Sequence, residues 1–265
     1  MNSDLILNSV IELVKRVGKY QIEQQSTFDR TKIEKKGLND LVSYVDKESE
    51  KMLVDGLERI YPEAGFIVEE NTKSERKEWN WIVDPLDGTT NFIHGIPCYA
   101  VSIALERNEE IQLGVVYNVP LNECFSAAKG NGAYLNGKRI EVTKTDALKD
   151  SLIATGFPIY NFKRQEAYLN MLRDLMQNTH GIRRIGAAAV DLCYVACGRV
   201  DVFYEYNLSP WDVAAGALIA KESGAIVSDF SKGDNWLFGK EIIASNPNLY
   251  DQFTGHIIKH FNIRE

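Results

Sequence analysis

The first quarter of the chain shows helical periodicity followed by a short apolar run. Apolar residues recur at helical spacing over residues 4–25, and a second helix is expected from Asp46 to Ile60, where "YPEAG" ends it. The stretch "GFIVEE" then reads as a short buried strand ending in two carboxylates. The chain therefore opens with two amphipathic helices and one strand.

The middle and the end of the chain differ in rhythm. "YAVSIALER", "IQLGVVYNV" and "ECFSAAKGNGAYLNG" alternate between apolar and polar residues across short turns, which predicts an antiparallel meander. From about residue 145, short apolar runs such as "VDVFYEY" and "EIIASN" alternate with helical stretches at 163–178, 187–198 and 210–222. That alternation indicates a mixed sheet covered by helices. We expect an N-terminal α+β half carrying a metal site, residues 1–145, packed tightly against a C-terminal α/β half, residues 146–265.

Composition narrows the class of protein. A chain of 265 residues suits one large domain or two smaller ones, and a net charge of −7 argues against a nucleic-acid partner. Small anionic substrates remain open, because a bound metal can invert the local field. The four cysteines, with no CxxC pair, read as buried free thiols. With neither a signal peptide nor a membrane-spanning run expected, a cytoplasmic protein is predicted.

The stretch "WIVDPLDGTTNF", residues 81–92, carries the strongest chemical signal. Asp84 and Asp87 follow the apolar strand "WNWIV", and Pro85 removes a backbone donor between them. Two carboxylates this close repel one another unless a cation or a proton lies between them. Hard oxygen ligands of this kind suit Mg²⁺.

The turn behind these acids favours phosphate. Gly88 leads into an expected helical turn at 89–94, with Thr89 or Thr90 as its cap, and free N–H groups at a helix start bind anions. Metal ligands and an anion cradle thus fall within a few residues. Together they suggest Mg²⁺-assisted phosphoryl transfer to water.

Three further acids stand at the ends of expected elements. Glu69 closes "FIVEE", Asp46 begins the second helix, and Asp212 follows Ser209 and Pro210 in a complete helix-start signal. Taken alone, helix capping explains Asp46 and Asp212 at least as well as chemistry does.

Rival motifs fit less well. An EF-hand loop counted from Asp84 would place Leu86, Gly88 and Gly95 at ligand positions, and none of them is acidic. A phosphatase of the haloacid-dehalogenase type would need a nucleophilic Asp at position 85, which is Pro. A glycosidase with paired carboxylates stays open from the acids alone, but it leaves the phosphate-ready turn unexplained.

Two long blocks resemble a known family. "WIVDPLDGTTNFIHGIPCYAVSIAL" is similar to the first signature of the inositol monophosphatases, members of the Mg²⁺-dependent, Li⁺-sensitive phosphatase superfamily, and "WDVAAGALIAKESGA" is similar to the second. "GLNDLVSYVDKESE", "FIVEE" and "RRIGAAAVDLCYVACGRVDVFYEYNLSPWD" match further blocks in the expected order, so the resemblance to a bacterial-type member covers nearly the whole chain.

The resemblance implies an alternating αβαβα layered sandwich with an antiparallel N-terminal sheet and a mixed C-terminal sheet, assembled as a homodimer. It also implies two or three Mg²⁺ ions in each active site. The metal ligands it implies are Glu69, Asp84, Asp87, Asp212 and the carbonyl of Leu86.

The same resemblance implies the catalytic and substrate-binding roles. Thr89 and Asp46 would position and deprotonate the attacking water, with Glu69 counted among the catalytic residues. Backbone N–H groups of Gly88 and Thr89 would hold the phosphate, and Glu205 would bind a sugar or inositol hydroxyl. The other substrate-side residues are Gly186, Ala187, Ala188 and Asp212.

The substrate is left open. Inositol 1-phosphate is the default that the family implies; fructose 1,6-bisphosphate and the 2′-phosphate of NADP(H) are alternatives, and adenosine 3′,5′-bisphosphate belongs to a more distant branch. Position 187 is Ala where many members carry a hydroxyl, and residues 156–165 lie in a region that varies. Nearby cations, which are either contacts to a second phosphate or solvated surface charge, are Lys163, Arg164, Arg183 and Arg184.

Two other classes of function compete with hydrolysis. The phosphatase scaffold could serve as a regulatory protein that binds a nucleic acid or another protein, as some bacterial relatives do. A structural Ca²⁺ or Mg²⁺ module would gain thermal stability from metal without releasing phosphate.

Overall fold

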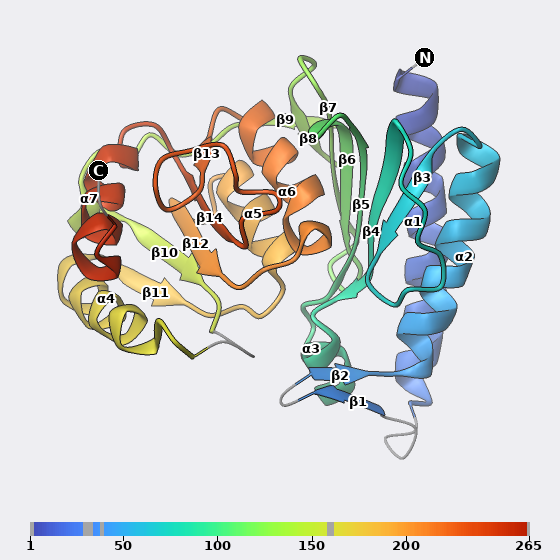
Figure 1. Ribbon diagram of the computed structural model, residues 1–265, viewed down its shortest axis with the longest axis horizontal. Coiled ribbons are helices and arrows are strands. Elements are labelled where there is room, and N and C mark those ends of the chain that lie inside the picture. The colour runs from blue at the N-terminus through green and yellow to red at the C-terminus, as the bar shows by residue number, and fades with distance from the viewer. Residues whose placement is uncertain (1–2, 29–33, 38–39, 158–161, 264–265) are drawn as a thin grey trace.

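The computed structural model describes residues 3–28, 34–37, 40–157 and 162–263. Two long helices form its first layer: α1 (Ser3–Ser26) and α2 (Tyr44–Ile60). Their apolar faces, including Val10, Leu13 and Leu53, are buried against the first sheet (Figure 1). Both helices predicted from periodicity are confirmed within two residues at each end.

The second layer is a seven-stranded sheet in the order β3-β4-β5-β6-β7-β8-β9. Its strands are β3 (Gly65–Val68), β4 (Trp79–Asp87), β5 (Ala100–Arg107), β6 (Glu110–Asn118), β7 (Glu123–Ala128), β8 (Ala133–Leu135) and β9 (Lys138–Ile140). The predicted antiparallel meander is confirmed from β4 onward. β3 and β4 pair in parallel, so the sheet as a whole is mixed. β1 (Glu34–Gly37) and β2 (Asp40–Val42) form a separate two-stranded ribbon.

The third layer holds two helices between the sheets, α5 (Ala188–Ala196) and α6 (Pro210–Glu222). Most residues of both are buried, as expected for helices that are apolar on every side. Small residues bring backbones close: a side chain at Gly114 of β6 would meet the backbone of Ala215 at 2.9 Å.

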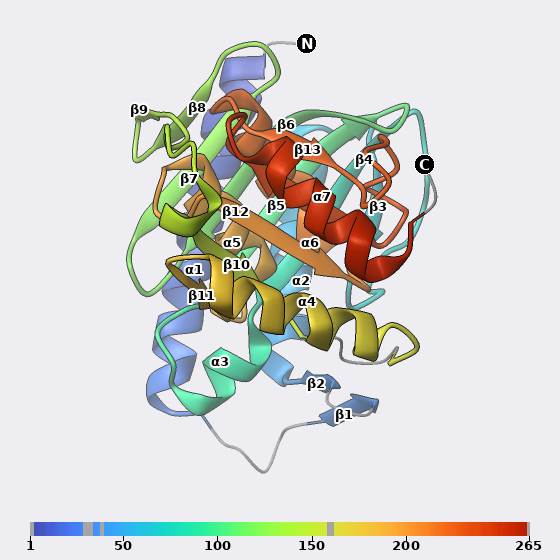
Figure 2. The same ribbon diagram turned by 90° about the vertical axis from the view of Figure 1, so that its left-hand side faces the viewer.

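The outer two layers complete the predicted sandwich. A mixed five-stranded sheet runs β11-β10-β12-β14-β13, and α4 (Gln165–Asn178) and α7 (Tyr250–Phe261) cover its far face (Figures 1 and 2). The strands are β10 (Leu152–Thr155), β11 (Gly181–Arg183), β12 (Val202–Tyr206), β13 (Ile226–Ser228) and β14 (Glu241–Ser245). Short helices α3 (Thr89–His94) and η2 (Leu148–Asp150) lie in connections. The αβαβα layering is confirmed.

Two smaller sequence predictions also meet the structure here. All four cysteines are free thiols, and Cys98, Cys124 and Cys193 are buried. Within the described ranges, no helix combines the length and the apolar character that crossing a membrane requires.

Candidate active site

A cavity of about 460 Å³ opens where the end of β4 meets the starts of α3, α5 and α6. It gathers residues that lie far apart in the sequence. The predicted residues that line it are Glu69, Asp84, Leu86, Asp87, Gly88, Thr89, Gly186, Ala187, Ala188, Glu205 and Asp212. Asp46 is not among the lining residues, but it contacts one of them, Thr89. The structure therefore brings every predicted site residue to one place.

The end of β4 differs from the prediction that Asp84 and Asp87 follow the strand. The strand continues to Asp87, and its pairing with β5 shifts register between Asp84 and Asp87. Pro85, which has no N–H to donate, lies in this irregularity. The Pro85 carbonyl accepts from Gln21 Nε2 at 2.7 Å, and Leu86 N–H donates to Asp84 Oδ1 at 2.9 Å. The bulge thus places both acids at the cavity.

The carboxylates that line this cavity repel one another. We call Glu69, Asp84, Asp87 and Asp212 the acidic pocket. Burial, followed by repulsion from the other three acids, raises the pKa of Asp84 well above its usual range. Burial raises the pKa of Asp87 to about 7, with Glu69 adding to the rise. Buried acids that repel in this way fit a hard cation, which would satisfy all of them at once.

The other two acids of the pocket are held by local structure. Glu69 follows β3, and the turn beyond it is fixed by Glu50, whose buried carboxylate accepts from Glu70 N–H at 2.6 Å and Thr72 N–H at 2.8 Å. Asp212 lies at the third position of α6 and accepts from Ser209 N–H at 2.6 Å in a capping box. Asp212 therefore starts the helix, as the capping reading predicts, and also lines the cavity, while its role as a metal ligand stays a prediction.

The helical turn at 89–94 is confirmed, but its predicted cap is wrong. Gly88, not Thr89 or Thr90, is the N-cap, and it makes no side-chain cap hydrogen bond. Gly88 has φ of +88°, a left-handed conformation that favours glycine. The conformation turns the chain sharply from β4 into α3.

Thr89 is instead joined to Asp46. Its Oγ1 lies 2.8 Å from Asp46 Oδ1 and 3.0 Å from the Leu86 carbonyl oxygen. The other oxygen, Asp46 Oδ2, accepts from Ser43 N–H at 2.9 Å as part of the capping box of α2. Burial raises the pKa of Asp46, against hydrogen bonds from Ser43 and Thr89. A buried carboxylate thus faces a hydroxyl at the cavity wall.

The start of α5 is occupied by an acid of the protein itself. Ala188 N–H donates to Asp87 Oδ1 at 3.2 Å, and Ala189 N–H donates to Asp87 Oδ2 at 2.9 Å. The family resemblance implies that residues 186–188 lie on the substrate side of the site. In the structure residues 186–188 do line the cavity. The N–H groups at the start of α5, however, are bonded to Asp87, a member of the acidic pocket.

The far wall carries two more buried acids. Burial raises the pKa of Glu205 to about 8, and it raises that of Asp191 well above the usual range, with Glu205 adding to the effect. Arg184 lines the same wall and opposes both shifts. A side chain at Gly156 would meet the Glu205 carboxyl at 2.0 Å, so only glycine leaves Glu205 in place.

The four candidate cationic residues lie in different surroundings in the structure. Arg184 lines the cavity, whereas Arg164 pairs with Glu241 and lies over the ring of Phe261 at 4.6 Å. Arg183 is exposed and donates to the carbonyl of Ile182. Lys163 is exposed as well. Of the variable segment 156–165, residues 158–161 lie outside the described residues.

Sequence reasoning missed four supporting residues. They are Gln21, Glu50, Asn91 and Asp191. Asn91 of α3 donates to the Cys98 carbonyl at 2.8 Å and to the Ile185 carbonyl at 3.0 Å, which joins the turn after β4 to the segment before α5. Asp191 interrupts an otherwise apolar run, "AAAVDLCYVA", and that was the one available signal.

Comparison with known proteins matches the chain to one protein family and to several of its members. The family described as the inositol monophosphatase family matches residues 3–264. A protein of Neisseria meningitidis named putative Nus factor SuhB is 43% identical, with 96% of this chain and 98% of the relative covered. A Mesorhizobium japonicum protein named inositol-1-monophosphatase is 39% identical, with 93% of each chain covered.

Solved structures give the same result. The SuhB extragenic suppressor protein of Bartonella henselae superimposes with a TM-score of 0.91 at 39% identity, covering 96% of this chain and 98% of that one. An inositol monophosphatase of Thermotoga maritima gives a TM-score of 0.89 at 34% identity, covering 97% and 98%.

Proposed function

The chain belongs to the inositol monophosphatase family, and from that membership we propose that it is a Mg²⁺-dependent phosphomonoesterase acting on a small phosphorylated polyol or sugar. Inositol 1-phosphate is the first candidate substrate. The observation that carries the proposal is the acidic pocket: four carboxylates converge on one cavity, where burial and repulsion raise the pKa values of Asp84 and Asp87.

The donor set of the acidic pocket suits Mg²⁺. Glu69, Asp84, Asp87, Asp212 and the Leu86 carbonyl would hold the ions, since all five offer hard oxygen atoms. Bound Mg²⁺ supplies an acidified water and neutralises charge on the phosphate. Two or three ions for each site remain the number that we propose.

The residues of the chain itself would handle the attacking water and the phosphate. Thr89 Oγ1 donates its proton to Asp46 Oδ1, which leaves a lone pair of Thr89 to accept a proton from water. Burial keeps Asp46 apart from solvent, so the pair acts as a relay toward the cavity. The N–H groups of Gly88 and Thr89, at the start of α3, would hold the phosphate oxygens.

The opposite wall would bind the alcohol part of the substrate. Glu205 lines the cavity and accepts hydroxyl protons when ionised, and Ala187 lacks the hydroxyl that many family members carry there. Arg184 is the cation in position to meet a second phosphate. Fructose 1,6-bisphosphate and NADP(H) therefore remain the alternative substrates.

The test is phosphate release with Mg²⁺ from four compounds: inositol 1-phosphate, fructose 1,6-bisphosphate, NADP⁺ and adenosine 3′,5′-bisphosphate. We expect the largest kcat/KM for inositol 1-phosphate. A preference for a bisphosphate would move the assignment to the alternatives and implicate Arg184. No release from any of the four, with Mg²⁺ binding verified by calorimetry, would contradict the proposal.

A second candidate function rests on the names of relatives. Proteins of Neisseria meningitidis, Vibrio cholerae and Escherichia coli at 39–43% identity are named Nus factors or putative Nus factors. A regulatory binding role on the phosphatase scaffold is therefore the alternative. Affinity purification from a native lysate of the source cell separates the two: a stoichiometric macromolecular partner together with negligible turnover would favour the binding role.

Several family properties stay predictions. They are homodimer assembly, lithium sensitivity, cytoplasmic location and the division into residues 1–145 and 146–265. Sedimentation measures the first, and inhibition of phosphate release by LiCl measures the second.

A further inference from the structure

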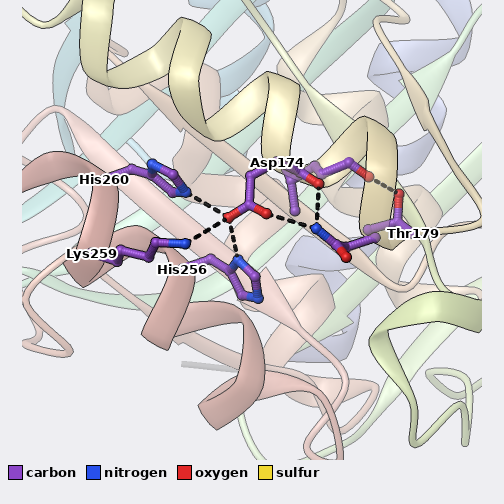
Figure 3. A network of polar contacts seen from close by, with 7 residues as sticks. Asp174, Thr179, His256, Lys259 and His260 are labelled. Atoms are coloured by element: carbon purple, nitrogen blue, oxygen red, sulfur yellow. Dashed lines mark hydrogen bonds and ion pairs between the residues drawn. The ribbon is translucent and has the colours of Figure 1, made fainter.

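A second group of ligand-type side chains lies on the opposite side of the five-stranded sheet from α5 and α6. Asp174 of α4 faces His256 and His260 of α7, where the two helices pack side by side (Figures 2 and 3). His256 Nδ1 is 2.8 Å and His260 Nε2 is 2.6 Å from the same atom, Asp174 Oδ2. We call these three residues the α4–α7 cluster.

The α4–α7 cluster has the spacing of a metal site. His256 and His260 are four residues apart, so both imidazoles project from one face of α7. One ligand atom from each of the three residues falls within 4.8 Å of the others. Among the described residues this is the group of three or more His, Cys, Asp and Glu side chains that meets that separation.

The supporting contacts orient the carboxylate. Asn178, one turn along α4, donates from Nδ2 to Asp174 Oδ1 at 2.7 Å, which leaves Oδ2 directed at the two imidazoles. The side chains of His256, Asp174 and His260 are 26%, 15% and 14% exposed. A cation could therefore enter from solvent and still be largely surrounded by protein.

We propose that Asp174, His256 and His260 form a second metal site, selective for a borderline divalent ion such as Zn²⁺ and distinct from the acidic pocket. Two imidazoles and one carboxylate are typical ligands of Zn²⁺, whereas Mg²⁺ prefers oxygen atoms alone. The fourth position would take water. The proposal does not depend on phosphatase activity.

Without a metal, ring protons of the imidazoles occupy the space beside Asp174 Oδ2 that a cation would fill. Each imidazole that donates to Oδ2 does so through a ring proton, and Zn²⁺ would release the protons that it displaces. Ligand bonds of about 2.0–2.1 Å in a tetrahedron separate ligand atoms by about 3.4 Å. The nitrogen–oxygen distances need to widen by less than about 1 Å from their present values.

One neighbour competes with a metal. Lys259 Nζ lies 3.5 Å from Asp174 Oδ2, and the lysine side chain is 66% exposed. A long exposed lysine moves into solvent at little cost. Lys259→Gln should therefore bind Zn²⁺ more tightly than the wild type, because it removes a competing cation and keeps all three ligands.

The experiment uses the full chain in excess Mg²⁺, which occupies the acidic pocket, at about pH 7.5. Zn²⁺ alone is the probe, and equilibrium dialysis counts the equivalents retained. We expect one tight equivalent in the wild type and a rise in Tm, since the ion joins α4 to α7. The double variant His256→Gln, His260→Gln should lose this equivalent, with affinity at least about 100-fold weaker.

A matched control and a spectrum make the result specific. His180 lies just beyond the end of α4, is exposed and is outside the α4–α7 cluster, so His180→Gln should bind Zn²⁺ as the wild type does. Co²⁺ in place of Zn²⁺ should give the strong visible absorption of a tetrahedral site with nitrogen ligands. Equal retention by the wild type and the double variant would overturn the proposal. If that double variant does not fold, unchanged or weaker binding by Lys259→Gln would overturn it instead.

Discussion

Two groups of carboxylates in this molecule have opposite electrostatics. In the acidic pocket, burial and mutual repulsion raise the pKa values of Asp84 and Asp87. In the α4–α7 cluster, hydrogen bonds from His260 and His256 lower the pKa of Asp174 against the effect of burial. In the first group burial and repulsion disfavour the charged carboxylates, whereas in the second hydrogen bonds from side chains favour the charged carboxylate.

This difference indicates which kind of metal ion each site would bind. Repelling oxygen ligands are stabilised by a hard ion of high charge density, whereas a carboxylate already paired with imidazoles suits an ion that accepts nitrogen. The two sites should therefore differ in ion preference, in the sign of their dependence on pH and in their importance for activity.

The largest expected effect is on turnover at the acidic pocket. Asp84→Asn removes one negative ligand from the buried pocket, and the lost stabilisation of several kcal/mol corresponds to about 10³-fold or more in kcat/KM for the preferred substrate. Phosphate release measures it. Asp55→Asn, an exposed acid on α2, is the control and should leave turnover unchanged. Near-normal activity of Asp84→Asn with intact circular dichroism would refute the assignment of the site.

The next effect is on the relay. Thr89→Val keeps the shape of the side chain and removes the hydroxyl that bonds Asp46, so kcat should fall by about 10²-fold. Thr89→Ser retains the hydroxyl and should recover most of the activity. Equal losses in the two variants would mean that the methyl group, not the hydroxyl, matters.

The third effect is the dependence of stability on pH, which should have opposite directions at the two sites. Because the folded-state pKa of Asp87 is raised to about 7, the folded chain holds protons that the unfolded chain releases between about pH 4 and pH 7. The free energy of unfolding of the metal-free protein should therefore fall as pH rises through that interval, by on the order of 4 kcal/mol.

Urea unfolding with a chelator present measures this slope, and Mg²⁺ should restore stability above pH 7. Glu205, with its pKa raised to about 8, extends the loss in the same direction. A metal-free stability that increased with pH over this interval would show that the acids are not buried together.

The smallest effect lies at the α4–α7 cluster without metal. Asp174→Asn should cost about 1 kcal/mol of unfolding free energy near neutral pH, because charge-assisted hydrogen bonds to two imidazoles are weakened. Since the folded-state pKa of Asp174 is lowered, this contribution is present above about pH 4 and is lost as pH falls further. Asp251 forms an exposed ion pair with Lys232, so Asp251→Asn should change stability little.

The layered fold was predictable because periodicity reports local structure and the resemblance supplied the stacking. The alternation of β5, β6 and β7 and the helix-start signal at Ser209, Pro210 and Asp212 both act within a few residues. The parallel pairing of β3 with β4 could not be read in the same way, because it depends on a contact that the connecting segment permits but does not specify.

The site shows the same boundary between local and distant information. Candidate acids were visible because a carboxylate beside an apolar strand is costly without a partner. The partners themselves were invisible: Gln21 reaches Pro85 across 64 positions, and Asp87 reaches the N–H of Ala189 across 102. The cap of α3 was wrongly predicted because the side chain of Thr89 is committed to Asp46, a contact made only after folding.

The double hydrogen bond from α5 to Asp87 has a consequence for how this protein could be tuned. The N–H groups at the start of α5 withdraw electron density from the Asp87 carboxylate, so Asp87 is a weaker ligand than the same buried acid would be without them. With Mg²⁺ bound as proposed, the residence time of the ion would therefore depend partly on a helix of the central layer. Substitutions along α5 could change how quickly the pocket exchanges its ions while leaving every acid in the pocket untouched.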